Sequence, residues 1–177
     1  MVKVKKIYEK LRTTALAIVE DSTISFSNKL TEIIKLHQVC NGFTKDDDGQ
    51  ILQLHKSKLH ALEETLEEID GKVIIWANYI YNITEIIDFL EKKYGKESVV
   101  SIYGAVDVKT RKEAVRRMQE DPKTRFLVGN PTTGGFGLTL TAVNTVIYFS
   151  NNYNLEVRKQ SEDRAHRLGQ KGTVVYI

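Results

Sequence analysis

The spacing of apolar residues predicts helices in the first third of the chain. Apolar side chains recur at helical intervals within residues 4–20, 29–40 and 57–70. A polar stretch separates the first two helices, and an acidic turn around Gly49 separates the second from the third. The side chains expected to face inward are Ile7, Leu11, Ala15, Ile18 and Val19 in the first helix, and Ile33, Ile34, Leu36 and Val39 in the second.

From Lys72 onward, short apolar runs alternate with helical patterns. The runs KVIIWA, SVVSIYG, RFLVGN, TVIYFS and GTVVYI predict strands, because continuous apolar runs of this length are typical of strands buried on both faces. Close alternation of strand and helix predicts right-handed βαβ units and a parallel sheet with helices on both faces. We therefore expect an α/β fold, in which residues 1–70 form a helical lead-in segment and residues 71–177 form the lobe that holds the sheet.

Composition limits the class of protein. The chain has 177 residues, of which 41% are hydrophobic and 28% charged, values ordinary for a globular domain with a sizeable core. Its apolar runs are too short to cross a bilayer, and no signal-peptide pattern opens the sequence, so we expect an intracellular protein, cytoplasmic or, in a eukaryote, nuclear. The net charge of +3 permits a nucleic-acid partner without requiring one.

A metal site is the first chemical possibility to weigh. The single cysteine, Cys40, excludes an internal disulfide. His37 and Cys40, followed by His55 and His60, loosely resemble the spacing of a zinc site. One thiolate with scattered histidines is a poor structural set, and the acidic turn lacks the ligand spacing of a calcium loop. We therefore expect no metal bound by this chain.

The segment after the third predicted strand favours a phosphate ligand. It reads PTTGGFGLTLTA, and ligands of parallel sheets bind at the carboxyl ends of the strands. Glycines let backbone N–H groups approach a phosphate, and threonine hydroxyls donate to phosphate oxygens. The residues concerned are Gly134, Gly135, Gly137, Thr132, Thr133, Thr139 and Thr141. Taken alone, the segment also fits a flexible connector between strands.

A second polar pattern lies in QSEDRAHRLGQ, residues 160–170. Gln160, Arg164 and Arg167 follow one another at i, i+4 and i+7, which places them on one face of a helix. Surface ion pairs with Glu156 or Asp163 are the alternative role for these arginines. Arginines and a glycine-threonine loop at the same edge of one sheet together indicate a phosphate-rich ligand.

The sequence lacks the parts that would activate a nucleoside triphosphate. No G-x-x-x-x-G-K-[ST] loop is present, and no acidic Mg²⁺-binding motif follows a strand. Arginines without a triphosphate pocket suggest half of a two-lobed motor, in which they reach into a site formed by the other half.

With these motifs in place, the chain resembles the second, C-terminal RecA-like lobe of the Swi/Snf-type DNA-dependent ATPases of helicase superfamily 2. The resemblance runs from about Leu30 to the end of the chain. KVIIWANY is similar to motif IV, IYGAVDVKTRKEAVRRMQED to the segment after it, and GNPTTGGFGLTLTAVNTVIYF to motif V. QSEDRAHRLGQ is nearly a full motif VI and is the most specific part.

The resemblance implies a role for each motif. Arg164 and Arg167 would act as arginine fingers on the γ-phosphate of ATP, with Gln160 holding the cleft geometry. Gly135 and Gly137 would contact the nucleotide, whereas Asn78, Tyr79, Gly104, Thr132 and Thr133 would lie along the DNA. ATP and Mg²⁺ would bind only in the full two-lobed enzyme. The implied partners are the N-terminal RecA-like lobe of the same protein and the backbone of duplex DNA, with no membrane.

Departures from the family pattern narrow the branch. Ser150, Asn152 and Leu155 stand where Asp, Asp and Pro are common, Asn144 stands where Asp is common, and Thr132 replaces an arginine of motif V. This form is similar to compact bacterial or viral members and to the annealing-helicase branch, so we do not expect a histone partner. The family usually continues beyond the strand that follows motif VI, which suggests an excised fragment.

Two functions of different class follow. The first is the ATPase lobe of a duplex-DNA translocase, inactive without the N-terminal lobe. The second is a non-catalytic nucleic-acid-binding or regulatory module with the same fold. The presence of both Arg164 and Arg167 favours the first, because a binding module does not need both at this spacing.

Overall fold

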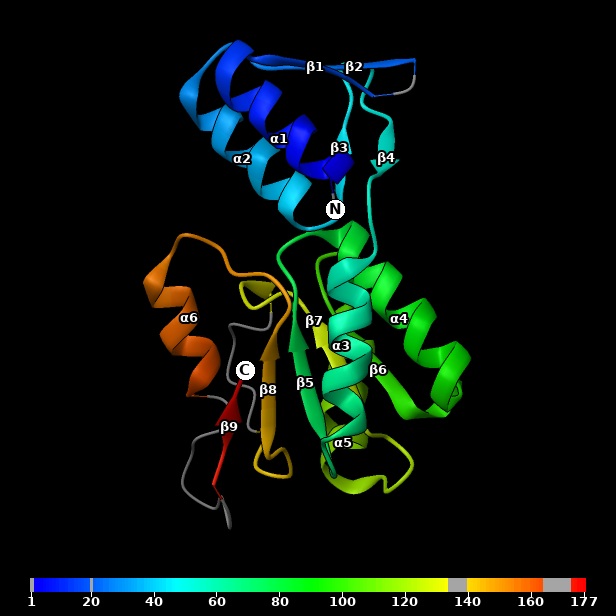
Figure 1. Ribbon diagram of the computed structural model, residues 1–177. Coiled ribbons are helices and arrows are strands. Elements are labelled where there is room, and N and C mark those ends of the chain that lie inside the picture. The colour runs from blue at the N-terminus through cyan, green and yellow to red at the C-terminus, as the bar shows by residue number, and fades with distance from the viewer. Residues whose placement is uncertain (1, 20, 134–139, 164–172) are drawn as a thin grey trace. The chain divides into compact units, whose positions relative to one another are not determined.

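The computed structural model describes residues 2–19, 21–133, 140–163 and 173–177. The chain divides into two compact units, Met1–Glu63 and Glu64–Ile177, and each is described below by itself (Figure 1). The division falls within helix α3 (Ser57–Glu67), a few residues before the boundary that the sequence suggests at residue 70.

The first unit combines the expected helices with two hairpins that the sequence did not predict. Helices α1 (Val2–Thr14) and α2 (Lys29–Cys40) contact each other. Strand β1 (Leu16–Val19) pairs antiparallel with β2 (Ser22–Ser25). The helix predicted over residues 4–20 was therefore wrong beyond Thr14. Ala15 adopts a φ of +57°, which ends the helix, and the apolar residues after it pair as a strand instead.

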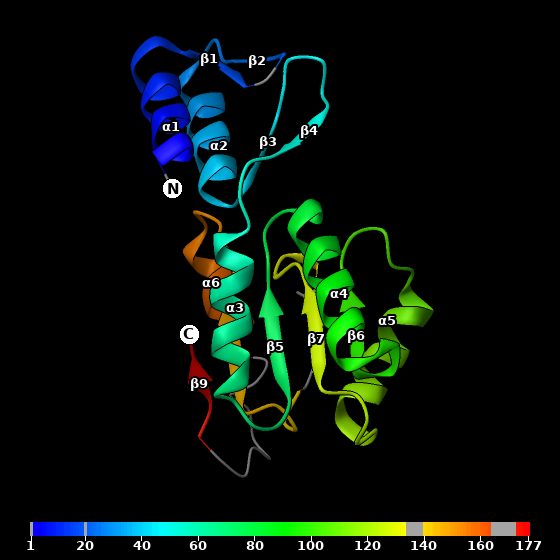
Figure 2. The ribbon, with the colours of Figure 1, turned by 45° about the vertical axis from the view of Figure 1, so that its right-hand side comes forward.

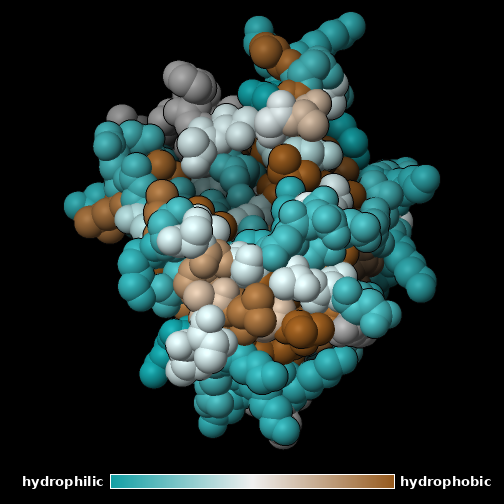
Figure 3. Space-filling view, turned by 90° about the horizontal axis from the view of Figure 1, so that it is seen from above, coloured by the Kyte–Doolittle hydropathy of each residue, from teal (hydrophilic) through white to brown (hydrophobic). Residues whose placement is uncertain are grey.

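Packing in the first unit also corrects the predicted orientation of α2. The core contains Ile7 and Leu11 of α1 together with Val39 of α2, as expected. Ile33 and Ile34, however, are 44% and 41% exposed, so the prediction that they face inward was wrong. The buried side of α2 instead includes polar groups: Glu32 is 8% exposed and pairs with Lys29 at 2.7 Å, and Gln38 is 9% exposed. The face of the molecule drawn in Figure 3 shows hydrophobic patches among hydrophilic side chains.

The predicted acidic turn is confirmed as the loop of a hairpin. Strand β3 (Phe43–Lys45) pairs antiparallel with β4 (Ile51–Gln53), and Gly49 between them has a φ of +83°. Asp47 in this loop accepts hydrogen bonds from the backbone N–H of Ser25 at 2.9 Å and from its hydroxyl at 2.7 Å. These bonds stabilise the ionised carboxylate, lower the pKa of Asp47, and join the two hairpins.

The second unit contains the predicted five-stranded parallel sheet. Its strand order is β6-β7-β5-β8-β9, and every neighbouring pair is parallel. All carboxyl ends therefore lie at one edge, the upper edge of the sheet in Figures 1 and 2. The strands are β5 (Val73–Trp76), β6 (Val99–Ile102), β7 (Phe126–Gly129), β8 (Thr145–Tyr148) and β9 (Val175–Tyr176).

Helices cover both faces of this sheet, which confirms the predicted α/β, RecA-like architecture. Helix α4 (Ile80–Tyr94) packs on one face, where the ring of Tyr94 lies 4.9 Å from that of Phe126. Helix α5 (Val108–Glu120) packs on the other face, where Met118 joins a core cluster with Leu127. Adjacent residues of a strand point to opposite faces, so β7 serves both layers. A short 3₁₀ turn, η1 (Lys96–Ser98), leads into β6, and α6 (Leu155–Glu162) follows β8.

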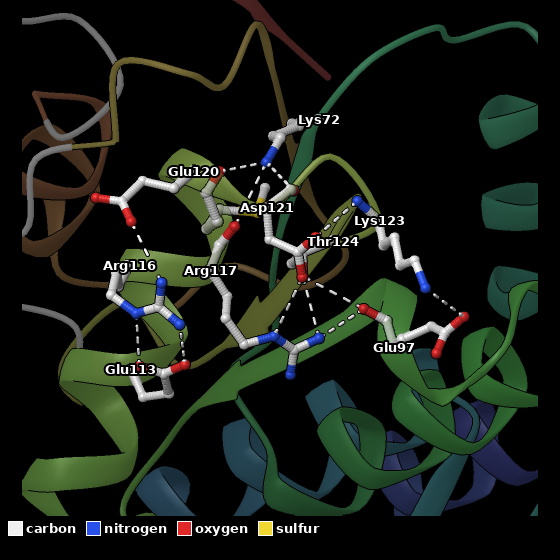
Figure 4. Close-up of polar contacts among 10 residues, drawn as sticks. Lys72, Glu97, Glu113, Arg116, Arg117, Glu120, Asp121, Lys123 and Thr124 are labelled. Atoms are coloured by element: carbon white, nitrogen blue, oxygen red, sulfur yellow. Dashed lines mark hydrogen bonds and ion pairs between the residues drawn. The ribbon is translucent and has the colours of Figure 1, made fainter.

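The amino edge of the sheet is held by a polar cluster with a structural role (Figure 4). Lys72, directly before β5, donates from Nζ to the carbonyl oxygens of Met118 and Asp121, both at 2.7 Å. These carbonyls belong to the C-terminal end of α5, where cations are favourable. Arg117 reaches from the same helix to the carbonyl of Glu97 at 2.6 Å and to the hydroxyl of Thr124 at 3.0 Å. The cluster therefore ties α5 to the starts of three strands, at the edge opposite to the carboxyl ends.

Candidate functional site

The carboxyl edge of the sheet brings several predicted site residues together. Four strands end in short segments at this edge, and each segment follows its strand without an intervening helix. The segments are residues 77–79 after β5, 103–104 after β6, 130–133 after β7 and 149–150 after β8. They include five residues predicted to lie along DNA, namely Asn78, Tyr79, Gly104, Thr132 and Thr133.

A hydrogen-bond network joins three of these segments through Asn78. The backbone N–H of Asn78 donates to Oγ of Ser150 at 2.8 Å, and its carbonyl oxygen accepts from Nδ2 of Asn130 at 3.0 Å. Oδ1 of Asn130 accepts in turn from the backbone N–H of Thr132 at 2.9 Å. Asn130 thus binds one predicted contact segment through its donor and another through its acceptor. Its amide fixes their relative position.

Close strand packing makes this network possible. A Cβ atom built on Gly129, the last residue of β7, would lie 2.3 Å from the carbonyl oxygen of Ile102 and 3.1 Å from the Trp76 ring. Glycine is therefore required here, because any other residue would push β7 away from β6 and β5. The next residue, Asn130, donates its N–H to the carbonyl of Ile102 at 3.0 Å.

Tyr79 sits half-buried at the start of α4. Burial raises the pKa of its phenol to about 12, with a contribution from Tyr153 and an opposing one from a hydrogen bond with Asn78. The phenol therefore remains neutral at physiological pH and can both donate and accept hydrogen bonds. A neutral hydrogen-bonding group with an apolar ring suits contact with a nucleic-acid backbone.

The loop containing Gly104 is supported by an arginine that sequence reasoning missed. Nη2 of Arg111, in the first turns of α5, donates to the carbonyl oxygens of Tyr103 at 3.2 Å and Gly104 at 3.3 Å. Asp107 caps α5 by accepting from the N–H of Lys109 at 2.9 Å. In the sequence, Arg111 could have been found as the basic residue four positions after the cap Asp107, in the first turns of the helix that follows a strand.

Residues of the glycine-threonine loop are described only in part. Thr132 is exposed and Thr133 is half-buried, directly after the network residue Asn130. The predicted nucleotide contacts Gly135 and Gly137 lie outside the described residues. Their roles stay predictions.

Helix α6 carries the first residue of the predicted arginine-bearing face. Gln160 is exposed, and its Nε2 donates to Oε1 of Glu156 at 3.2 Å. Arg164 and Arg167 lie outside the described residues, so their orientation stays a prediction. Gln160 itself lies on the helix surface and is available to face a partner.

The described part of α6 is anchored firmly to β8. The guanidinium of Arg158 lies 3.3 Å from the centroid of the Tyr148 ring, and Nη1 donates to Oδ1 of Asn151 at 2.8 Å. The hydroxyls of Tyr148 and Ser161 are 2.5 Å apart, and Ser161 is fully buried. Burial raises the pKa of Tyr148. These contacts fix the helix that leads into motif VI.

Among the departures from the family pattern, Ser150 has a clear structural role in this chain. Ser150 is 2% exposed and supplies the acceptor for the Asn78 N–H. The Asn144 side chain lies 2.9 Å from the position of a Cβ on Gly71, whose φ is +86°. Leu155, at the start of α6, is 67% exposed, and Asn154 caps that helix by accepting from the Glu156 N–H at 2.9 Å.

Metal-ligating side chains do not gather in the part of the chain that the structure describes. Across these residues there is no group of three or more His, Cys, Asp or Glu side chains that could hold an ion. Cys40 is exposed. His55 accepts from the Ser57 N–H at 3.3 Å through Nδ1, which leaves Nε2 as the donor to the Val39 carbonyl at 3.1 Å. Over the same ranges, no helix is both long and apolar enough to span a membrane.

Comparison with known proteins agrees with the fold and motifs. The model of the helicase conserved C-terminal domain matches residues 57–169. An uncharacterized ATP-dependent helicase of Mycoplasma pneumoniae is 31% identical over 175 residues, covering 96% of this chain and 16% of that protein. The chromatin-remodeling ATPase INO80 of Candida glabrata is 32% identical over 126 residues, covering 68% of this chain and 8% of that protein. The chain thus spans a small part of these relatives.

Solved structures show the same architecture. The C-terminal domain of the Sulfolobus solfataricus SWI2/SNF2 ATPase superposes with a TM-score of 0.63 at 21% identity, covering 99% of this chain and 71% of that one. The C-terminal part of the Fun30 ATPase domain gives a TM-score of 0.60 at 27% identity, covering 70% of this chain and 43% of that one. The chain belongs to the helicase conserved C-terminal domain family, as the C-terminal RecA-like lobe of a Snf2-type superfamily 2 helicase. Both bacterial helicases and chromatin remodellers appear among its relatives, so the narrower branch stays a prediction.

Proposed function

We propose that this chain is the C-terminal ATPase lobe of a duplex-DNA translocase, and that it contributes arginine fingers and part of the DNA track. The N-terminal RecA-like lobe of the same protein would bind most of the ATP. The lobe would be inactive without that partner. Such a reaction would take place inside the cell, in the cytoplasm or, in a eukaryote, in the nucleus.

The observation that carries this proposal is the network around Asn78. Residues from β5 and β7 that the family places along DNA are held together by Asn130, with Ser150 of β8 completing the arrangement. One side-chain amide thus bonds to both segments that contain predicted DNA contacts. A fixed spacing is what phosphate contacts require, since they set the register of a protein on a duplex.

The residues of this chain fit a contribution to ATP binding that is secondary to that of the other lobe. The sequence has no phosphate-binding lysine loop, and its described carboxylates do not gather into a cluster suited to the ion. Mg²⁺ would therefore be held by the other lobe and by the phosphates. From this chain, the backbone of Gly135 and Gly137 would contact the nucleotide, and Arg164 and Arg167 would neutralise charge that develops on the γ-phosphate.

Translocation would follow from coupling these two roles. Guanidinium groups can engage the γ-phosphate only when the two lobes close. ATP turnover would therefore alternate open and closed arrangements, while the Asn78 and Thr132 segments hold the DNA backbone. Gln160 would help to orient the arginine-bearing face of its helix.

A reconstitution experiment tests the proposal. The isolated chain should fold and show no ATP hydrolysis above background, whereas its fusion with the N-terminal lobe should hydrolyse ATP when duplex DNA is added. An Arg164→Ala, Arg167→Ala variant of the fusion should lose that turnover. DNA binding by the fusion without any ATP hydrolysis would instead favour the non-catalytic binding module. Hydrolysis by the pure isolated chain that depends on Arg167 would overturn the two-lobed proposal.

A further inference from the structure

The first helix has the highest net positive charge of the helices that the structure describes. Helix α1 carries Lys3, Lys5, Lys6, Lys10 and Arg12 and one carboxylate, Glu9. These residues give α1 a net charge of +4. The whole chain has a net charge of +3, so all the remaining residues together sum to −1. No sequence motif accounted for this concentration.

The cations of α1 all lie on its solvent side. Ile7 and Leu11 are buried in the core of the first unit and are 7% and 0% exposed. Lys3, Lys6 and Lys10 follow at i, i+3 and i+7, which places them along one line of the helix surface, and all are exposed. The side chains in the core and the basic side chains are therefore different residues, so a ligand can bind the exposed cations without displacing the core.

Glu9 is the single carboxylate within α1, against five cations of that helix. Glu9 lies 3.9 Å from Lys5, at the limit of an ion pair, and the Lys5 side chain is 79% exposed. Lys6, Lys10 and Arg12 surround a shallow hollow of about 470 Å³ that Glu9 and Thr13 also line. Like charges held this close repel one another, which destabilises an isolated helix slightly. A polyanion in the hollow would reverse that effect.

The chemistry of the face favours phosphates over an acidic protein. Among the α1 side chains that the structure describes, every exposed one is charged or a threonine. Protein interfaces depend on buried aromatic or aliphatic anchors, and this face offers none among those side chains. Phosphate contacts need only cations and hydroxyls. The 13 residues of α1 are about 20 Å long, the length of roughly six base pairs of duplex.

We infer that the exposed face of α1 is a second binding site for nucleic-acid backbone phosphates, in addition to the contacts at the carboxyl edge of the sheet. Lys6, Lys10 and Arg12 form its centre. The choice of duplex DNA as the polyanion rests on the proposed function. Binding here would be independent of base sequence and would lengthen the stretch of duplex that the protein contacts.

The test compares two triple variants of the full 177-residue chain. The first is Lys6→Gln, Lys10→Gln, Arg12→Gln, which removes the charge and keeps good helix formers. The control is Lys92→Gln, Lys96→Gln, Lys123→Gln, which removes the same charge from exposed positions of the second unit near the amino edge of its sheet. Circular dichroism and thermal unfolding would establish that both variants fold like the unaltered chain.

Duplex affinity is then measured from about 50 to 200 mM salt. Each lost phosphate contact should reduce the slope of log affinity against log salt by about 0.9. The α1 variant should bind at least about 40-fold more weakly at 50 mM salt, and its loss of affinity across the range should be roughly 40-fold smaller than that of the unaltered chain. The control should shift the slope far less.

Three outcomes would overturn the inference: an α1 variant with an unchanged slope, an equal effect of the control variant, or no duplex binding by the unaltered chain. A fourth would replace it. If poly-glutamate binds through α1 and duplex DNA does not, the face recognises an acidic protein. The proposed function is judged separately, because the two-lobed fusion would still lose ATP turnover on substitution of Arg167 whichever result α1 gives.

Discussion

The Asn130 side chain holds the backbone of Asn78, since its Nδ2 donates to the Asn78 carbonyl oxygen at 3.0 Å. The same amide accepts from the Thr132 N–H at 2.9 Å through Oδ1. A carboxylate at this position would lose the donor, and an aliphatic side chain would lose both hydrogen bonds. Asn130 therefore positions these two segments, and under the proposed function it would act on DNA only through them.

Replacing Asn130 with Asp tests that role. The carboxylate would keep the acceptor toward Thr132, lose the donor toward Asn78, and bring two acceptors together. We expect a loss of about 1–3 kcal/mol in stability and a fall in duplex-DNA affinity. Urea unfolding and DNA titration measure the two effects. Asn130→Gln, which keeps the amide and moves it by one methylene, should recover DNA affinity only in part. If neither variant changes DNA affinity, the network is structural alone.

Ser150 completes the same arrangement from the other side. Ser150→Ala would leave the Asn78 N–H without its acceptor in a region where Ser150 is only 2% exposed, so we expect a cost of about 1–3 kcal/mol. Ser27→Ala, at an exposed position of the first unit, is the matched control and should change stability by less than about 0.5 kcal/mol. Denaturant titration of both variants decides the matter. Equal stabilities would mean that Ser150 contributes no net stabilisation.

The strands of the sheet were predictable because their sequence signal is unambiguous. Runs such as VIIW and FLVG are fully buried in the structure, and no helical pattern competes with them. The first unit was harder, because Ile18 and Val19 continue the helical spacing of α1 past its real end. What stops α1 is a positive φ at Ala15, a residue type that gives no warning of such a conformation.

The candidate site was predictable in its residue types and not in its connections. Asn78 and Thr132 could be placed at one edge, because parallel strands end together. The role of Asn130 depends on the register of β7 against β5, which no local pattern reveals. For Ile33 and Ile34, the prediction from residue type was itself wrong. Their apolar character predicted burial, whereas the buried side of α2 contains hydrogen-bonded Glu32 and Gln38.

Alkaline pH should destabilise the protein in part through Tyr79. Its pKa is raised to about 12 in the folded protein from 10.0 when exposed. Between these values the unfolded chain has released the proton and the folded chain still holds it, so stability falls as pH rises from 10 toward 12. The effect is at most about 2 kcal/mol, because the side chain is only half-buried. Tyr79→Phe should flatten this part of the stability curve. If stability falls equally steeply with pH in the unaltered protein and in the Tyr79→Phe variant, Tyr79 does not contribute to this pH dependence.

Lys72 should stabilise the second unit from its amino edge. Lys72→Met keeps the aliphatic stem and removes the donor to the Met118 and Asp121 carbonyls, which should cost about 1–2 kcal/mol. Lys123→Met, at a side chain that is 70% exposed, is the control and should have little effect. Thermal unfolding of both variants measures the difference. DNA affinity should not change specifically in the Lys72 variant, because the cluster lies at the amino edge of the sheet.

Motif VI provides the sharpest test of the proposed reaction. In a fusion with the N-terminal lobe, Arg167→Lys keeps the charge and loses the planar fork that can neutralise two phosphate oxygens at once. An arginine finger is typically worth about 10³–10⁵ in turnover, so the variant should lose most DNA-stimulated hydrolysis. ATP affinity should fall much less, because the other lobe supplies most ground-state binding.

Gln160→Ala should have a smaller effect on turnover, since an exposed amide would orient the helix and not neutralise charge. If Arg167→Lys instead lowers the unfolding temperature sharply, Arg167 is a structural ion-pair residue. If the variant folds and hydrolyses ATP at the normal rate, Arg167 is not an arginine finger.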